Sequence, residues 1–192
     1  MESIAEKTYS VKEYFDLEAQ SEVRREYVHG TLIEMPGESK IANKISLNCA
    51  FALRKMLQSK GFEIYTHDVR LMIGDGNIYR YPDVVVVPTT DREDSHIITS
   101  PVLIVEVLSE NTEATDRGKK LQEYCSLSSL QYYLLVSQDA TIIECYSRLN
   151  TGWQYTFYTQ QEDKITLDFF QTTLSPAEVY EGIDISDDTL RK

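Results

Sequence analysis

Apolar residues recur at helical spacing in several stretches of the chain. The stretch over residues 11–18 follows Ser10, which forms a capping-box pattern with Glu13. A longer stretch, residues 41–57, has apolar side chains three and four positions apart and is predicted to be a second helix. Two further helices are expected, one from Asn111 or Thr112 to about residue 127 and a short one near residues 176–180.

Strands are predicted where β-branched and aromatic residues cluster between turn residues. The expected strands cover residues 26–28 and 31–33 (a hairpin around His29-Gly30), 62–66, 69–73, 79–87, 101–108, 132–136, 142–147, 153–159 and 165–169. The polar stretch of residues 88–100 is predicted to be a loop, and loops of that length are often functional.

The order of these elements predicts the fold class. Residues 101–108 are almost continuously apolar, which is typical of a central strand buried on both faces. The strand–helix–strand succession across residues 101–136 indicates one parallel crossover, and three later strands follow in meander rhythm. We therefore expect an α/β (α+β) fold in which a mixed β-sheet is flanked by helices.

Composition is that of an ordinary globular protein. The 192 residues are 42% hydrophobic and 26% charged, enough for one domain with a sizeable core. The longest apolar runs are far shorter than the roughly 20 residues that span a bilayer, and the opening carries no secretory pattern. We expect a cytoplasmic protein without a membrane partner, in which Cys49, Cys125 and Cys145 are reduced core thiols.

The charge balance restricts the class of partner. The net charge is −12, whereas proteins that bind nucleic acid non-specifically usually carry a basic balance or stripe. Acidic residues crowd both ends, including Glu2, Glu6, Asp187 and Asp188, while the middle of the chain is more balanced. Tight non-specific binding of DNA is therefore not expected without added cations.

Glu106 is the first candidate for chemistry. Side chains alternate along a strand, so Glu106 shares a face with Ile104 and Leu108. A lone carboxylate there is costly or takes up a proton unless a cation or hydrogen-bond donors meet it. The alternative to a metal is a buried ion pair with an arginine such as Arg70 or Arg80.

Asp83 is the second candidate, because it follows Pro82 and opens the apolar run of residues 84–87. By itself it could be a strand-start residue that bonds local backbone amides. Together with Glu106 on an adjacent central strand, it suits Mg²⁺, which prefers oxygen ligands and keeps several waters.

The helix after Glu106 supplies a stripe of polar residues. Asp116, Lys120 and Tyr124 follow one another at four-residue spacing and so share a face. Lys120 could reach back to the two carboxylates and offset charge on a phosphate, with Asp116 and Tyr124 in support. The alternative is a solvated Asp116–Lys120 pair. Glu26, between the first helix and the hairpin, is by sequence alone an exposed glutamate.

Six short motifs follow one another along the chain. They are Tyr9-Ser10-Val11 with Glu13-Tyr14, Glu26-Tyr27-Val28 with Gly30, Tyr81-Pro82-Asp83-Val84, Val105-Glu106-Val107-Leu108-Ser109, Asp116 with Lys120 and Tyr124, and residues 131–136. In this order they resemble a bacterial family of restriction-endonuclease-like proteins, long catalogued as a domain of unknown function, within the PD-(D/E)XK nuclease superfamily. The resemblance implies that residues 1–192 form one nuclease-like domain, with a core over about 9–182 and acidic terminal extensions.

The resemblance implies a site for one or two Mg²⁺ (or Mn²⁺) ions. Asp83 matches the aspartate of the Pro-Asp motif, and Glu106 matches the acidic position of the second motif. Val107 would add its backbone carbonyl, and Glu26 matches a glutamate that often completes the site. Lys120 matches a lysine that the family has moved to the following helix.

The chain departs from the family pattern at three positions. Leu108 stands where the superfamily has its lysine. Ala42 stands near the start of the second helix, where relatives tend to carry a histidine. His29 replaces the usual acidic turn residue.

The predicted function is Mg²⁺-dependent hydrolysis of phosphodiester bonds in nucleic acid, DNA rather than RNA, by a nuclease. Arg70, Arg80 and Arg117 are the candidate contacts for nucleic acid. Two alternatives remain: a catalytically degenerate member that binds nucleic acid or protein, and a structural dimer whose carboxylates are paired to arginines. A homodimer is expected because aromatic residues crowd both faces of one late strand, at positions 153, 155, 157 and 158, and one face could be an interface. A core-facing hairpin would explain half of these residues equally well.

Overall fold

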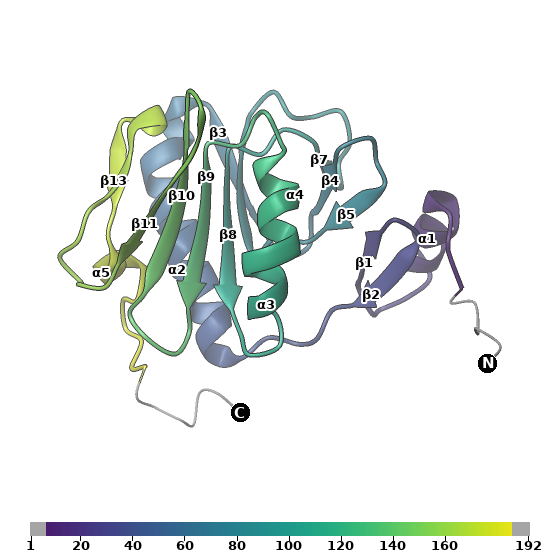
Figure 1. Ribbon diagram of the computed structural model, residues 1–192, viewed down its shortest axis with the longest axis horizontal. Helices are drawn as coiled ribbons and strands as arrows, with labels where there is room; N and C mark the ends of the chain where they lie inside the picture. Colours follow the sequence, from purple (N-terminus) through teal and green to yellow (C-terminus); the bar gives the residue numbers. More distant parts are fainter. Residues whose placement is uncertain (1–6, 186–192) are drawn as a thin grey trace.

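A six-stranded sheet forms the centre of the computed structural model, which describes residues 7–185 (Figure 1). The strand order is β11-β10-β9-β8-β6-β3. Its members are β3 (Phe62–Thr66), β6 (Val84–Pro88), β8 (Leu103–Leu108), β9 (Tyr132–Ser137), β10 (Ile143–Leu149) and β11 (Gly152–Tyr158). β8 and β9 pair in parallel and the other neighbours pair antiparallel, so the expected crossover and mixed sheet are confirmed.

A second sheet has the order β2-β1-β5-β4-β7. Its strands are β1 (Arg25–Val28), β2 (Thr31–Glu34), β4 (Arg70–Ile73), β5 (Ile78–Arg80) and β7 (Ile97–Ile98). The predicted hairpin is β1–β2, and its turn residues His29 and Gly30 both have positive φ, as two-residue hairpin turns often require. The segment predicted as a loop contains the short strand β7, which pairs in parallel with β4.

The single strand predicted over residues 79–87 is wrong. β5 ends at Arg80 and β6 starts at Val84, and the two strands belong to different sheets. Pro82 lies in the break; it has no N–H to donate to a ladder and restricts the backbone of Tyr81. The break leaves Asp83 at the start of β6, where the two sheets diverge.

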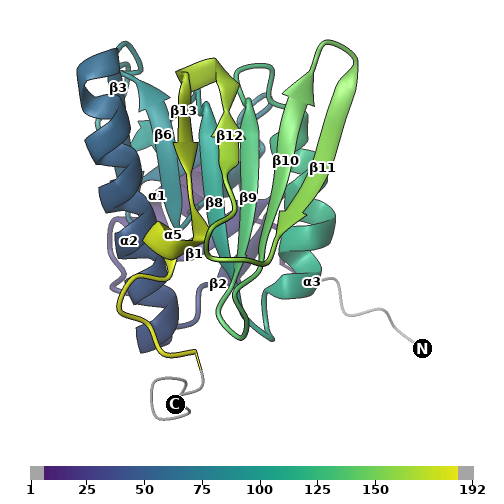
Figure 2. The same ribbon diagram turned by 90° about the vertical axis from the view of Figure 1, so that its left-hand side faces the viewer.

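One face of the six-stranded sheet is covered by α2 (Lys40–Leu57), as Figure 2 shows. The hairpin of β12 (Ile165–Leu167) and β13 (Thr172–Leu174) lies beside α2, with α5 (Pro176–Val179). Aliphatic side chains of α2, β6, β8 and the hairpin form one buried cluster. The strand predicted over residues 165–169 is shorter than expected, because β12 ends at Leu167. The strand β13 was not predicted.

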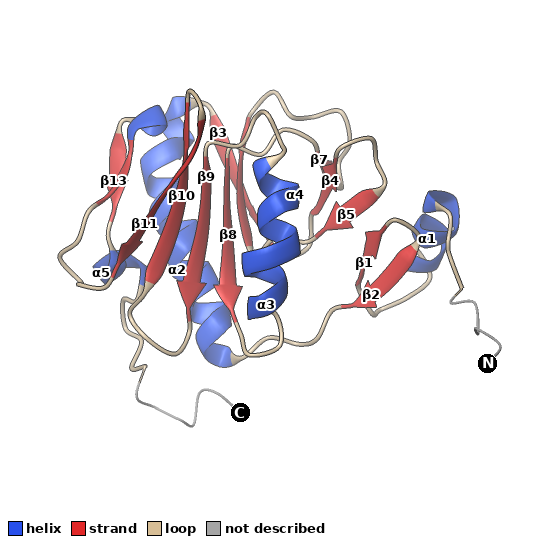
Figure 3. Ribbon diagram, viewed as in Figure 1, coloured by secondary structure: helices blue, strands red, loops and turns tan. Residues whose placement is uncertain are grey.

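The opposite face is covered by the helical segment between β8 and β9 (Figure 3). It consists of α3 (Glu113–Thr115), a π-helical turn (Asp116–Lys120) and α4 (Leu121–Cys125). The π turn was not predicted. Such turns often lie at functional sites, and this one carries Asp116 and Lys120.

The N-terminal helix α1 (Val11–Glu18) begins with the predicted capping box and packs against the second sheet. Tyr14 of α1 packs with Tyr27 of β1 and Tyr79 of β5.

All three cysteines are free thiols; Cys49 and Cys145 are buried, whereas Cys125 is partly exposed. Within residues 7–185, no helix combines the length and apolarity needed to cross a bilayer. The acidic terminal residues noted in the sequence at positions 2, 6, 187 and 188 lie outside the described residues.

Candidate active site

Strand registers place His67, Asp83 and Glu106 side by side across β3, β6 and β8. β6 and β8 pair with Val84 opposite Val105, so one further step places Asp83 opposite Glu106. β3 pairs with the other edge of β6, and just past its end the N–H of His67 donates to the carbonyl oxygen of Asp83 at 3.3 Å. Three potential functional residues therefore meet where these strands begin or end.

Asp83, Glu106 and Lys120 line one cleft with a volume of about 520 Å³. Its other walls come from the segment before α2, residues 35–39, and from the segment after β8, residues 109–112. Ala42, at the position where relatives tend to carry a histidine, also lines the cleft. The three predicted catalytic side chains thus share one cleft.

Lys120 holds the centre of a buried polar cluster. Its Nζ lies 3.1 Å from Oε1 of Glu106 and 3.0 Å from Oδ1 of Asp116. Tyr124 donates a hydrogen bond from its hydroxyl to the same Oε1 of Glu106, at 2.7 Å. The stripe predicted on this helix therefore faces the sheet, and the solvated Asp116–Lys120 pair is excluded because both residues are buried.

The pKa values of this cluster reflect burial and an excess of negative charge. Burial raises the pKa of Glu106 well above its usual value, although the ammonium of Lys120 acts in the opposite direction. Burial acts to lower the pKa of Lys120, but the charges of Glu106, Glu26 and Asp116 outweigh it and raise that pKa. Lys120 is therefore a stable ammonium beside a carboxyl group that is costly to ionise.

Asp83 lines the cleft, and its carboxylate is hydrogen-bonded to the backbone of the neighbouring strand. Its Oδ2 accepts a hydrogen bond from the backbone N–H of Val107 at 2.6 Å. Burial raises the pKa of Asp83 to about 7, despite that hydrogen bond. The N–H of Val107 is thus committed to Asp83, while a metal-binding role for its carbonyl stays a prediction.

Glu26 is buried rather than exposed as the sequence suggested. Its Oε2 accepts a hydrogen bond from Arg80 at 2.6 Å, and its Oε1 lies 3.7 Å from Nζ of Lys120. Arg80 also donates two hydrogen bonds, each 2.8 Å long, to Glu123. Glu26 is therefore linked to Lys120 at the edge of the cluster, and its place in a metal site stays a prediction.

The structure gives no support to the prediction that Arg80 contacts nucleic acid. Arg80 is 1% exposed, and its guanidinium is occupied by Glu26 and Glu123. In this structure the guanidinium is therefore not available to a phosphate. Within the described residues, neither Asp83 nor Glu106 forms an ion pair with an arginine, so the arginine-paired alternative finds no support at these two carboxylates.

The other two predicted arginine contacts are partly exposed but lie outside the walls of the cleft. Arg70 donates to the hydroxyl of Tyr81 at 2.6 Å and lies over the ring of Phe15. Arg117 forms ion pairs with Glu113 and Glu144. Their contact with nucleic acid stays a prediction.

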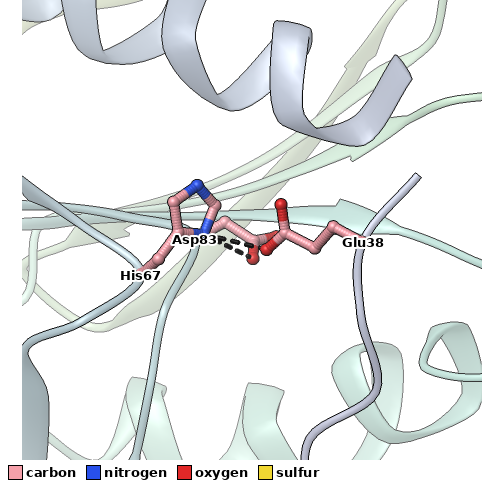
Figure 4. Close-up of side chains that lie close together, drawn as sticks. All are labelled: Glu38, His67 and Asp83. Atoms are coloured by element: carbon pink, nitrogen blue, oxygen red, sulfur yellow. Dashed lines mark ion pairs between the residues drawn. The ribbon is translucent and has the colours of Figure 1, made fainter. Parts of the chain in front are cut away.

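Sequence reasoning missed Glu38 and His67, which lie beside Asp83 (Figure 4). Nδ1 of His67 lies 2.8 Å from Oε1 of Glu38 and 3.8 Å from Oδ1 of Asp83. Glu38 precedes the cap of α2 and His67 follows β3, so no sequence spacing connects them. The only local signal was a histidine directly after a predicted strand, which is weak evidence for a functional residue.

Comparisons with known proteins agree with this architecture. Two uncharacterized proteins of Synechocystis sp. are similar: one is 33% identical over 175 residues, 91% of this chain and 92% of the relative. The other is 29% identical over 169 residues, 86% of this chain and 96% of the relative.

A solved structure has the same fold. It is described as a putative nuclease belonging to DUF820 from Anabaena variabilis, and it superposes with a TM-score of 0.72. The match covers 90% of this chain and 97% of that one at 17% identity, so it supports the fold alone. The family model described as "Uma2: Putative restriction endonuclease" matches residues 11–179. Since that match spans most of the sequence, the chain belongs to the Uma2 family.

Proposed function

We propose that the cleft hydrolyses phosphodiester bonds of nucleic acid with the help of a divalent cation, Mg²⁺ or Mn²⁺. The observation that carries the proposal is the convergence of Asp83, Glu106 and Lys120 on one cleft. Membership of a family described as "Putative restriction endonuclease" supports DNA as the substrate in preference to RNA.

The donors around the cleft fit a cation. Among the described residues, four carboxylates form ion pairs with Lys120 or Arg80: those of Glu26, Glu106, Asp116 and Glu123. A fifth carboxylate, Asp83, lies beside this cluster with His67 as its ion-pair partner. This excess of negative charge favours a divalent ion with oxygen ligands. Asp83 and Glu106 would hold it, and it would act as a Lewis acid toward the phosphate and lower the pKa of a water molecule.

The protein's own residues would orient the reacting groups. Lys120 stays protonated, so its ammonium can stabilise negative charge that develops on a phosphate in the cleft. Asp116 holds Lys120 from the adjacent turn of helix, and the hydroxyl of Tyr124 fixes the carboxylate of Glu106. Both supports are buried, which keeps the geometry rigid.

Plasmid nicking tests the proposal. The native chain and Glu106→Ala are incubated with supercoiled DNA and Mg²⁺ or Mn²⁺, and the exposed Glu162→Ala serves as the matched carboxylate control. We expect nicking by the native chain and by Glu162→Ala, and at least a hundredfold loss in Glu106→Ala. Equal activity in all three preparations would indicate a contaminating nuclease, and DNA binding without cleavage would favour the degenerate alternative.

We also propose that the protein forms a homodimer through the edge strand β11. Phe157 is 61% exposed and Tyr155 is 51% exposed, and their rings lie 6.5 Å apart between centroids. Exposed aromatic side chains on a strand that forms the edge of its sheet, among the described residues, are a typical contact surface.

A further inference from the structure

A histidine and two carboxylates converge at the edge of the cleft, where Glu38, His67 and Asp83 point toward one another (Figure 4). One potential ligand atom from each residue lies within 4.8 Å of the other two. Two ligands that each lie about 2.1 Å from a bound ion can be about 4.2 Å apart. The separations of 2.8 and 3.8 Å from Nδ1 of His67 to the two carboxylates are therefore compatible with one shared ion.

The backbone of His67 is held in a conformation that orients the ring. Its φ is 51°, in the left-handed region that residues other than glycine seldom adopt. The N–H of Asp68 donates a hydrogen bond to the carbonyl oxygen of Thr66, which closes a tight turn around His67. The N–H of His67 donates to the carbonyl oxygen of Asp83. A strained residue fixed by its neighbours in this way is a reason to examine the site for function.

The three residues can be reached from outside. Glu38 and Asp83 line the active-site cleft, and Glu38 and His67 also line an adjoining cleft of about 970 Å³. The side chain of Glu38 is 33% exposed, so an ion could enter and keep water ligands on its open side. Two carboxylates beside one imidazole also supply the charge that a divalent cation needs.

We infer that Glu38, His67 and Asp83 form a binding site for a divalent transition-metal ion such as Zn²⁺, in preference to Mg²⁺. The reason for the preference is the imidazole nitrogen, which suits Zn²⁺ and similar ions, whereas Mg²⁺ takes oxygen ligands. The site shares Asp83 with the proposed nuclease centre, but Glu38 and His67 have no part in that proposal. Binding of the ion does not require that the protein cleave DNA.

Titration of the metal-free full chain with Zn²⁺ and, separately, Mg²⁺ tests the inference by calorimetry. His67→Asn removes the ligand but keeps a residue that tolerates positive φ. His29→Asn is the matched control, because His29 also has positive φ but lies in the β1–β2 turn. We expect His67→Asn and Glu38→Gln to bind Zn²⁺ at least about tenfold more weakly than the native chain, and His29→Asn to bind it equally well.

An NMR measurement on the native chain tests the site even if a variant does not fold. Substoichiometric Zn²⁺, which is diamagnetic, should shift the ring-nitrogen NMR signals of His67 in the native chain, but not those of His29 or His96. Equal Zn²⁺ affinity in folded His67→Asn, no preference for Zn²⁺ over Mg²⁺, or an unaffected His67 ring would each overturn the inference.

The outcomes separate this site from the proposed nuclease. Glu106→Ala should keep its Zn²⁺ affinity while losing DNA nicking, because Glu106 is not among the three ligands. If Zn²⁺ binding depends on His67 but no preparation nicks DNA, the metal site stands and the nuclease proposal fails. If nicking depends on Glu106 but Zn²⁺ binding does not depend on His67, the nuclease proposal stands and the metal site fails.

Discussion

The ammonium of Lys120 lies 3.1 Å from the carboxylate of Glu106, although one residue belongs to a helical turn and the other to a central strand. Both side chains are largely buried, so water can replace the partner of either group only in part. This pair therefore connects the stability of the protein with its proposed chemistry, and it is the first target for mutation.

Replacing Lys120 with Met should destabilise the protein by about 3 kcal/mol, because a buried Glu106 and Asp116 lose their shared cation. Urea unfolding at neutral pH measures the change, and plasmid nicking should be lost in the same variant. The exposed neighbour Lys119→Met is the control and should change stability by less than about 0.5 kcal/mol. A stable Lys120→Met variant that still nicks DNA would contradict the assignment.

Arg80 is expected to stabilise the fold rather than contact nucleic acid. Replacing it with Met removes the guanidinium that Glu26 and Glu123 share, leaves Glu26 only the more distant Lys120, and should cost about 3 kcal/mol in urea unfolding. The exposed Arg92, which pairs with Glu63, serves as the control, and Arg92→Met should cost less than about 1 kcal/mol. Similar losses in the two variants would show that the buried network contributes little.

The raised pKa of Asp83 predicts that stability depends on pH. In the folded, metal-free protein its pKa is about 7, compared with 3.8 for an ordinary aspartate. The folded state therefore binds this proton more tightly than the unfolded state, so the contribution is fully present below about pH 4 and is lost as pH rises to 7.

Asp83→Asn removes this dependence. In the presence of a chelator the variant should be more stable than the native chain at pH 8, by on the order of 2–4 kcal/mol, and the difference should shrink toward pH 4. Urea unfolding at several pH values measures it, with the exposed turn residue Asp75→Asn as the control. If the native chain instead gained stability relative to Asp83→Asn as pH rises, the predicted pH dependence would be contradicted.

If the protein is a dimer through β11, a substitution in that strand should lower the molecular mass measured in solution. Phe157→Arg places a charge on the exposed face of the edge strand and should convert a dimer into a monomer in sedimentation experiments. Phe51→Arg is the matched control, because Phe51 is 71% exposed on α2, far along the chain from β11. Dissociation by Phe51→Arg alone would move the interface to α2, and a native monomer would exclude the dimer.

Local patterns in the sequence were sufficient for most elements. The helix over residues 41–57, the β1–β2 hairpin and the crossover from β8 to β9 all follow from periodicity and turn residues, which act over short distances. The proximity of Asp83 and Glu106 could also be anticipated, because each sits in or beside an apolar strand that belongs in the centre of a sheet.

Other features depended on contacts between distant segments. The sequence shows Arg80 only as a basic residue in a strand; its burial depends on Glu26 and Glu123, which are brought to it by β1 and α4. His67 and Glu38 meet Asp83 only after β3, β6 and the segment before α2 have packed together. Sequence by itself therefore determined most of the elements and two of the acids, because side-chain periodicity is local. Tertiary structure decided which charges share a cavity, because ion pairing depends on distance in space and not along the chain.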